Sequence, residues 1–485
     1  MTTILARNAE VLVTMDGGRR ELKGAGIYAE NGIIKQVGAN AELPGTADIV
    51  IDLGGQIVLP GFVNTHHHLN QTLMRNLPAG QNNNLFAWLQ AHYRVWARTD
   101  EEASRASTLI GLAELALSGC TTVFDHSYVF KNGNNVDCQI EAAKDIGLRF
   151  HASRGSMSLG ESKGGLPPDD CVEDEAFILR DSERVIKAHH DASHGSMTQI
   201  VLAPCSPFSV TTSLLKDSAA LARQHKIKLH THLCETMDEE RYTLQHFQLR
   251  PVDWMESLGW LGDDVWFAHA IHVDDDEIRK FAATGCGAAH CPSSNMRLAS
   301  GIAPIKKYMD AGVKVGLGVD GSSSNDCSNI LLEARQALLL ARLRHGLLPP
   351  EGARKYMLLS QSHPVRAKEW MTAREVLELA TLGGARVLGA PISARWSPAN
   401  APISSPSISI PSAMPAPCTI PWRRFSSAPL SKPARPSSTA RSWCATARSS
   451  PWRWRRSSRR ITAALLGLRT KAEGGIRVKP QSPAH

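Results

Sequence analysis

The chain has 485 residues, enough for one large domain and a smaller one, and its apolar fraction of 42% is ordinary for a globular protein. No apolar stretch is long enough to cross a bilayer, and the N-terminus lacks the basic and apolar regions of a secretion signal. The ten cysteines form no C-x-x-C pair, which argues against disulfides or a cysteine zinc site and favours free thiols in the cytoplasm.

The net charge of +8 comes from the C-terminal tail. Residues 391–485 hold 16 of the 54 Lys and Arg but only one of the 46 acids, so this tail carries +15 and residues 1–390 carry −7. We therefore expect no nucleic-acid partner for the folded part, because a basic patch is the usual electrostatic footprint of such binding.

Residues 1–58 are predicted to form short strands at 9–13, 26–29, 33–37 and 49–53. Turns at Asp16-Gly17-Gly18 and Asn31-Gly32 separate them, and Asn-Gly between apolar strands is a strong hairpin signal. We interpret this segment as the N-terminal part of a small β-sandwich.

From residue 59 to 390, short apolar segments alternate with longer helical ones. Strands are predicted at 58–64, 121–125, 199–202, 228–232, 265–269, 287–290 and 315–318, and helices at 100–118, 138–146, 214–224, 274–284 and 305–311. Repeated strand–helix units predict a parallel sheet, and this many favour a closed (β/α)8 barrel. Because such barrels carry their chemistry at the C-terminal strand ends, reactive residues should directly follow the apolar runs.

Residues 391–485 break this pattern, with 14 of the 27 prolines and five tryptophans among arginines. One interpretation is a disordered basic tail. We favour a shifted reading frame and a poorly ordered product. In the shifted frame, each codon consists of the third base of one printed codon and the first two bases of the next. With permitted third bases, residues 391–410 then encode a strand-and-turn sequence, D-I-G-A-L-V-A-G-K-R-A-D-L-V-A-L-D-L-D.

The first candidate functional residues are His66 and His68, which follow the apolar strand after Pro60-Gly61. Two residues apart on an extended chain, both side chains point to the same side, and His67 points away. At a barrel strand end that side is the pocket, where two imidazoles can share one metal.

Two further strands end in histidines. His230 and His232 share one face, and Glu235 follows where the chain turns, within reach of a substrate beside a metal. His269 ends the next strand and can polarise a substrate group or water, whereas His272 is interpreted as a loop-holding residue. The alternative is that these are hydrogen-bonded structural histidines with a surface glutamate.

Asp320 closes the apolar segment 315–319 among glycines, where an unpaired charge is costly. Metal ligation or a histidinium would satisfy it. Polar sites at four separate strand ends are hard to ascribe to structure alone. Three neutral imidazoles and one carboxylate suit Zn²⁺ well and Fe²⁺ acceptably, with an open position for water.

Over residues 1–390 the chain resembles the amidohydrolase superfamily. The resemblance rests on Pro60-Gly61 through His66 and His68, the step from His232 to Glu235, His269 and Asp320. It is closest to the cytosine and guanine deaminase branch and most similar to deaminases of 8-oxoguanine, on segments 71–76 (QTLMRN), 85–89 (LFAWL), 203–208 (APCSPF) and 290–297 (HCPSSNMR).

The resemblance implies one divalent metal, Zn²⁺ with Fe²⁺ as the alternative, whose ligands are His66, His68, His232 and Asp320. Relatives with two metals bridge them by a carboxylated lysine at a middle strand end. Here the corresponding strand leads into Ala203-Pro204-Cys205, which supports a single metal.

The implied reaction is hydrolytic deamination of an aminopurine, 8-oxoguanine to urate and ammonia. Asp320 accepts the proton of water, Glu235 protonates the ring nitrogen and then the leaving ammonia, and His269 polarises the attacking oxygen. Gln71 reads the polar edge of the ring, Trp88 stacks on it or forms a lid, and Cys205 lines the pocket. Trp88 and Cys205 could equally be core residues.

The superfamily builds its small β-sandwich from both chain ends, and the segment that precedes the second part is present at 380–385 (ATLGGA). The expected turn after it occurs only in the shifted frame. We expect a cytoplasmic homo-oligomer that binds a small heterocycle and no membrane. Rival interpretations are a triazine or pterin aminohydrolase, a non-catalytic scaffold, and a nucleic-acid binder that depends on the tail alone.

Overall fold

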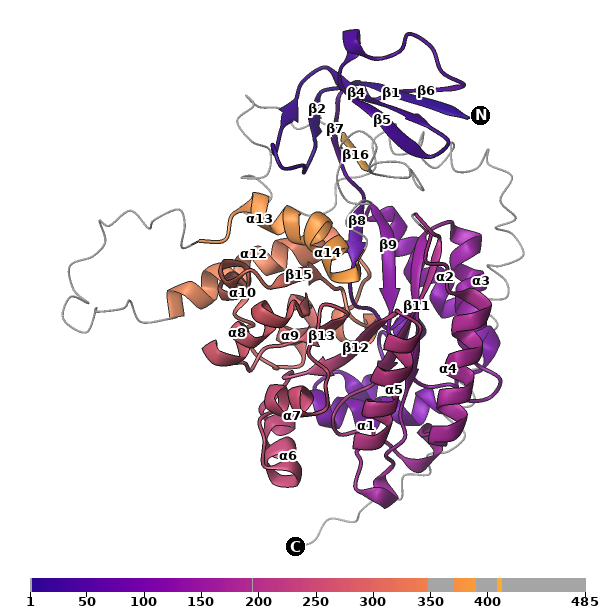
Figure 1. The fold of residues 1–485 in the computed structure, drawn as a ribbon, viewed down its shortest axis with the longest axis vertical. Helices are drawn as coiled ribbons and strands as arrows, with labels where there is room; N and C mark the ends of the chain where they lie inside the picture. The colour runs from indigo at the N-terminus through magenta and orange to yellow at the C-terminus, as the bar shows by residue number, and fades with distance from the viewer. Residues whose placement is uncertain (1, 194, 348–369, 390–407, 412–485) are drawn as a thin grey trace, which may run out of the picture. The chain divides into compact units, whose positions relative to one another are not determined.

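A computed structural model describes residues 2–193, 195–347 and 370–389, and the backbone of a strand at 408–411. Its central feature is a closed barrel of eight parallel strands in the order β10-β11-β12-β13-β14-β15-β8-β9 (Figure 1). In chain order the barrel strands are β8 (Phe62–Asn64), β9 (Cys120–Asp125), β10 (Arg149–Ser156), β11 (Thr198–Pro204), β12 (Lys228–Leu233), β13 (Val265–His269), β14 (Gly287–His290) and β15 (Lys314–Leu317). The predicted (β/α)8 barrel is confirmed.

Helices follow the strands and surround the barrel (Figure 1). They are α1 (Leu85–Trp96), α2 (Glu101–Leu117), α3 (Val136–Ile146), α4 (Glu175–His189), α5 (Thr212–Gln224), α6 (Met237–Phe247), α7 (Pro251–Ser257), α8 (Asp275–Thr284), α9 (Pro292–Arg297), α10 (Ile305–Ala311), α11 (Ser322–Asn325), α12 (Ile330–Leu347), α13 (Ala373–Glu378) and α14 (Gly384–Leu388). Within the described ranges, none of these helices has the length and apolar character needed to span a membrane.

Side-chain caps explain why the helices begin where they do. Asp100 accepts a hydrogen bond from the backbone N–H of Ala103, and Thr211 accepts one from Leu214. Asp274 accepts from two N–H groups in the first turn of α8. These caps satisfy donors that a helix start leaves unpaired, so the predicted helices begin within a residue or two of their expected positions.

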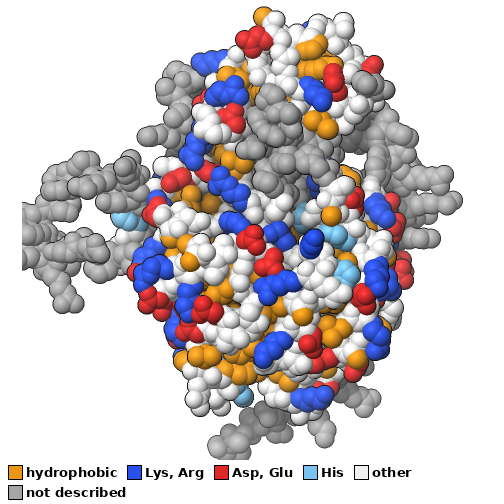
Figure 2. Space-filling model, in the orientation of Figure 1, with side chains coloured by type: hydrophobic (Ala, Val, Ile, Leu, Met, Phe, Trp, Pro, Cys, Tyr) orange, Lys and Arg blue, Asp and Glu red, His pale blue; other side chains and the backbone are white. Residues whose placement is uncertain are grey.

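Apolar side chains fill the barrel. Val63, Phe124 and Trp266 lie on three different strands and pack with Ala385 and Val387 of α14. Each large buried side chain of this kind stabilises the fold by roughly 1.5–3 kcal/mol. This packed core holds the strand ends in fixed positions. Outside, Lys and Arg side chains are interspersed with Asp and Glu on the face drawn in Figure 2.

The small domain contains two four-stranded sheets, in the orders β5-β4-β1-β6 and β16-β7-β2-β3. Its strands are β1 (Thr3–Ala9), β2 (Val11–Val13), β3 (Glu21–Leu22), β4 (Ala25–Glu30), β5 (Ile33–Ala39), β6 (Ile49–Asp52), β7 (Gln56–Leu59) and β16 (Ile408–Pro411). Buried side chains of both sheets form one core, including Leu12, Ile27 and Val58. Asn31 and Gly32 join β4 to β5 with φ of 49° and 77°, which confirms the predicted hairpin.

The segment predicted as one strand at 58–64 is two strands in different sheets. β7 belongs to the small domain and β8 to the barrel, and Pro60-Gly61 separates them. Pro60 has no N–H to donate to a ladder, and a Cβ at Gly61 would lie 2.3 Å from Thr121 Cγ2. The predicted strand at 9–13 is similarly divided, between β1 and β2.

β10 and α4 were not predicted. β10 carries Arg149 and Arg154, and both are buried, so the strand lacks an apolar run. Arg154 is held by Asp181 at 2.6 Å and by Glu173 at 3.1 Å, which compensates its burial. Pairing of opposite charges across elements is a tertiary feature that local periodicity does not report.

The prediction of an aberrant, poorly ordered tail at 391–485 lies outside the described residues, except at β16. There residues 408–411 pair antiparallel with β7, Ile408 opposite Leu59 and Pro411 opposite Gln56. A segment from the C-terminal part of the chain therefore contributes a strand to the small domain.

Gly383→Ala tests how tightly the segment at 380–385 packs on the barrel. A Cβ at residue 383 would lie 2.1 Å from the carbonyl oxygen of Val315 in β15, so backbone must move. We expect a loss of about 1–3 kcal/mol in the free energy of unfolding, measured by urea denaturation. Gly346→Ala in α12 is the control: its Cβ meets no atom within 4 Å, so stability should hold or rise. Equal stability of Gly383→Ala and the parent chain would contradict this packing.

Candidate metal and catalytic site

The predicted reactive residues meet at the C-terminal ends of the barrel strands. His66 and His68 follow β8, His232 lies in β12, His269 ends β13, and Asp320 follows β15. All five side chains are buried. Residues separated by up to 254 positions in the chain thus face one cavity, as the strand-end argument predicts.

Hydrogen bonding fixes which nitrogen of His66 carries the proton. The Nδ1–H of His230 donates to the carbonyl oxygen of Trp266 at 2.9 Å, because a carbonyl can only accept. The Nε2 of His230 is therefore an acceptor, and it receives the Nδ1–H of His66 at 3.0 Å. This leaves a lone pair on His66 Nε2, which is buried and has no hydrogen-bond partner among the described residues.

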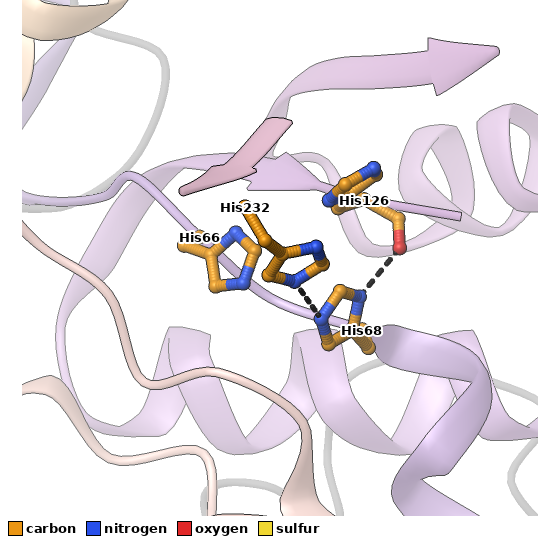
Figure 3. A group of neighbouring side chains, drawn as sticks. All are labelled: His66, His68, His126 and His232. Carbon is orange, nitrogen blue, oxygen red and sulfur yellow. Dashed lines mark hydrogen bonds between the residues drawn. The ribbon is translucent and has the colours of Figure 1, made fainter. Parts of the chain in front are cut away.

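His68 and His232 are fixed in the same way. The Nδ1–H of His68 donates to the carbonyl oxygen of His126 at 2.6 Å (Figure 3). The Nδ1–H of His232 donates to the carbonyl oxygen of Cys205 at 2.6 Å. Their Nε2 atoms consequently face each other as two lone pairs 3.1 Å apart. Two acceptors at this distance repel unless a positive charge lies beside them.

Asp320 completes the donor set. Its Oδ1 lies 3.4 Å from His66 Nε2 and 3.3 Å from His68 Nε2. In a tetrahedral site with bonds near 2.0–2.1 Å, neighbouring donors are separated by about 3.3 Å. The donor types and spacings therefore fit a small divalent cation. The cation-capable clusters found among the described residues, His66/His68/His126/His232 and His66/His269/Asp320, share this site.

Burial makes these imidazoles neutral ligands. It lowers the pKa of His68 to about 3 and that of His232 well below its usual value. Burial alone would raise the pKa of Asp320, but the imidazoles of His66, His68 and His269 hold it well below the usual range. Three neutral nitrogens and one carboxylate is the charge pattern that a divalent metal requires.

Glu235 and His269 form a second pair beside the donor set. Glu235 Oε2 lies 3.5 Å from His269 Nε2, and Ser300 Oγ donates to Glu235 Oε1 at 3.4 Å. The other nitrogen of His269 lies 2.9 Å from Asn295 Oδ1. Burial raises the pKa of Glu235 above its ordinary value, although His269 opposes the shift. Glu235 can thus hold a proton at a pH where an exposed glutamate would lose it.

The loop that carries Glu235 is itself anchored. Cys234 adopts a left-handed backbone conformation with φ of 54°, which turns the chain directly after β12. The backbone N–H of Cys234 donates to the buried Glu239 Oε1 at 2.6 Å. Glu239 thereby fixes the turn from the first helical turns of α6.

The three predicted substrate contacts line one cavity beside these residues. Gln71 lies against Gly321, where a Cβ would be 1.8 Å from the amide oxygen of Gln71. Trp88 is 3% exposed and packs on His92 with ring centroids 4.1 Å apart, so it is both a core residue and a pocket wall. Cys205 is also buried, and burial raises the pKa of its thiol to about 12.

Other residues of the site were assigned no role from sequence. His126 follows β9, stacks on His232 with centroids 4.8 Å apart, and holds His68 through its carbonyl. Tyr128 packs edge-on against His68 at 5.2 Å, and Tyr93 also lines the cavity. The strand-end rule applied to residues 121–125 would have found His126 and Tyr128.

Two other sequence-based assignments agree with the structure. His67 forms a hydrogen bond with Ser328 and does not face the metal donors, and His272 forms a hydrogen bond with the loop carbonyl at residue 300.

Comparison with known proteins agrees with the fold. The model of the Amidohydrolase family matches residues 57–393. The chain therefore belongs to the Amidohydrolase family.

Its relatives act on nitrogen heterocycles. The 8-oxoguanine deaminase of Pseudomonas aeruginosa is 45% identical over 391 residues, covering 80% of this chain and 82% of that protein. An isoxanthopterin deaminase from an unknown prokaryotic organism is 37% identical, covering 79% and 80%. The crystal structure of atrazine chlorohydrolase TrzN from Arthrobacter aurescens TC1 with zinc has a TM-score of 0.75 and 32% identity, covering 82% and 85%.

His66→Ala tests the donor set directly. Loss of one of the three free Nε2 lone pairs should reduce the metal content per chain at least tenfold. Elemental analysis after dialysis measures it. His67→Ala is the matched control, since its Nε2 lies 2.9 Å from Ser328 Oγ on the other side of the chain. Full metal occupancy in His66→Ala would refute the ligand assignment.

Proposed function

We propose that this chain catalyses the hydrolytic deamination of an aminopurine, 8-oxoguanine, to urate and ammonia. The observation that carries the proposal is a buried carboxyl with a raised pKa, Glu235, beside three imidazole lone pairs and a carboxylate. This arrangement supplies an acid and a cation site on the same cavity wall. The 45% identity to a deaminase named for 8-oxoguanine supports this ring over others.

We infer that His66, His68, His232 and Asp320 hold one cation, with Zn²⁺ favoured over Fe²⁺. Three nitrogens and one oxygen at tetrahedral spacing are typical zinc donors, and a relative at 32% identity was crystallised with zinc. Bound there, such a cation would activate water by lowering its pKa to roughly 7. The absence of a lysine at the end of β11 supports a single metal.

The chain's own groups then move the protons. Asp320 takes a proton from the attacking water. Glu235 donates its proton to the ring nitrogen next to the amine-bearing carbon. It then takes the hydroxyl proton of the resulting tetrahedral adduct and delivers that proton to the departing amine, and the proton held by Asp320 returns to Glu235. His269 lies 3.5 Å from Glu235 and 3.8 Å from Asp320, so it can fix and polarise the water between them. Water ends as the new carbonyl oxygen, and the amine leaves as ammonia.

The substrate roles follow from the cavity walls. We infer that Gln71 reads the polar edge near the reacting carbon, since its buried Oε1 has no partner within the described residues. Trp88 closes one side of the cavity as a lid, and Cys205 lines the side next to His232, with its sulfur 4.0 Å from the His232 ring nitrogen Nδ1.

A second candidate is an aminohydrolase of a pterin or a triazine. Relatives named for isoxanthopterin and hydroxydechloroatrazine are each 37% identical. The same acid and cation would serve these rings, so a substrate panel separates them. The buried donor set argues against a non-catalytic scaffold, since a cluster of unpaired lone pairs costs stability without a ligand.

We further infer a cytoplasmic homo-oligomer with no nucleic-acid or membrane partner. All eight cysteines in the described ranges are free thiols, as a reducing compartment favours. If salt-dependent nucleic-acid binding persisted after removal of residues 391–485, this result would instead favour the rival interpretation of a nucleic-acid binder.

The deciding assay compares kcat/KM for 8-oxoguanine, guanine, isoguanine, cytosine, isoxanthopterin and a hydroxylated triazine. We expect 8-oxoguanine to be the best substrate, with ammonia and urate formed in equal amounts. A higher kcat/KM for a triazine or pterin would replace the purine assignment.

Glu235→Gln tests the acid. The amide keeps the shape of the side chain but carries no transferable proton, so turnover should fall by about 10²–10⁴ while metal content is unchanged. Steady-state kinetics and elemental analysis measure the two quantities. Glu141→Gln on the surface of α3 serves as the control and should keep full activity. Near-normal turnover would remove Glu235 from the mechanism.

A further inference from the structure

The cavity lining has two chemically different parts. Gln71, Glu235 and Asp320 are polar and lie beside the metal donor set, whereas α1 supplies Leu85, Trp88, Leu89 and Tyr93. Tyr128 lies between the donor set and α1, since its ring centroid is 5.2 Å from His68 and 6.0 Å from Trp96 of α1. A ring held with its reacting carbon beside the donor set can therefore direct its opposite edge toward α1.

The α1 face carries two polar atoms without partners. The indole N–H of Trp88 and the hydroxyl of Tyr93 are buried and make no hydrogen bond to any described residue. Trp88 is 3% exposed and Tyr93 is 0% exposed, and both line the cavity. A buried donor left unpaired costs about 1–3 kcal/mol, so a ligand that accepts from it gains affinity.

We propose that Trp88 and Tyr93 select purines that carry a carbonyl on the five-membered ring. In 8-oxoguanine the C8 carbonyl lies across the bicycle from the amine-bearing C2, whereas guanine has only C–H there. The Trp88 N–H can donate but not accept, so it matches a carbonyl oxygen and has no partner on guanine. The Tyr93 hydroxyl is a second unpaired donor of α1 that lines the same cavity. This inference rests on the proposed aminopurine function.

Trp88→Phe and Tyr93→Phe test the selection. Tyr93→Phe removes only the hydroxyl, whereas Trp88→Phe removes the N–H together with part of the ring, a loss of volume that the Trp96→Phe control shares. We expect kcat/KM for 8-oxoguanine to fall about tenfold in each variant, which corresponds to one lost hydrogen bond. The value for guanine should stay within about twofold. Trp96→Phe is the matched control: its indole N–H is also buried without a partner, but Trp96 does not line the cavity.

The outcomes separate the two claims. Parent enzyme that deaminates neither purine refutes the proposed function itself. Parent enzyme that prefers 8-oxoguanine, with variants that lose activity equally on both purines or on neither, refutes the selection by Trp88 and Tyr93 alone. A selective loss that Trp96→Phe does not share supports it.

Discussion

The site depends on one constraint: the Nδ1–H of each metal-facing imidazole is already committed to an acceptor. His68 and His232 donate to backbone carbonyls, and His66 donates to His230, which donates to a carbonyl in turn. The remaining lone pairs are buried and point toward one another. The protein therefore holds them in an electrostatically repulsive arrangement that only a cation relieves. Folding of the barrel supplies the free energy that brings these nitrogens together, before any ligand binds.

The barrel holds this arrangement at some conformational cost. His269, Ala270 and Asp320 adopt left-handed backbone conformations, with φ of 69°, 45° and 61°. Side chains other than glycine rarely adopt this region, and each instance costs on the order of 1 kcal/mol or more. All three residues stand where a strand gives way to its loop. The turns aim His269 and Asp320 at the cavity instead of along the strand, while the packed interior around Phe124 and Trp266 keeps the strands in register.

The sequence predicted the barrel and the donor positions because both depend on local patterns. An apolar run that ends in a polar residue places His66, His269 and Asp320 without knowledge of the fold. It did not predict β10, because Arg149 and Arg154 interrupt the apolar run that usually marks a buried strand. Nor did it assign Asn295 to His269 or Trp266 to His230, since these contacts depend on distances between strands that no spacing along the chain encodes. The unpaired donors of α1 likewise became visible only with the cavity.

The most direct test of the central claim is an anomalous diffraction experiment on crystals of the metal-loaded protein, with data collected on both sides of the zinc absorption edge. The account predicts a single peak within bonding distance of the Nε2 atoms of His66, His68 and His232 and a carboxylate oxygen of Asp320. A peak bound through the Nδ1 atoms, a peak elsewhere in the chain, or a second peak of equal height in the cavity would contradict it.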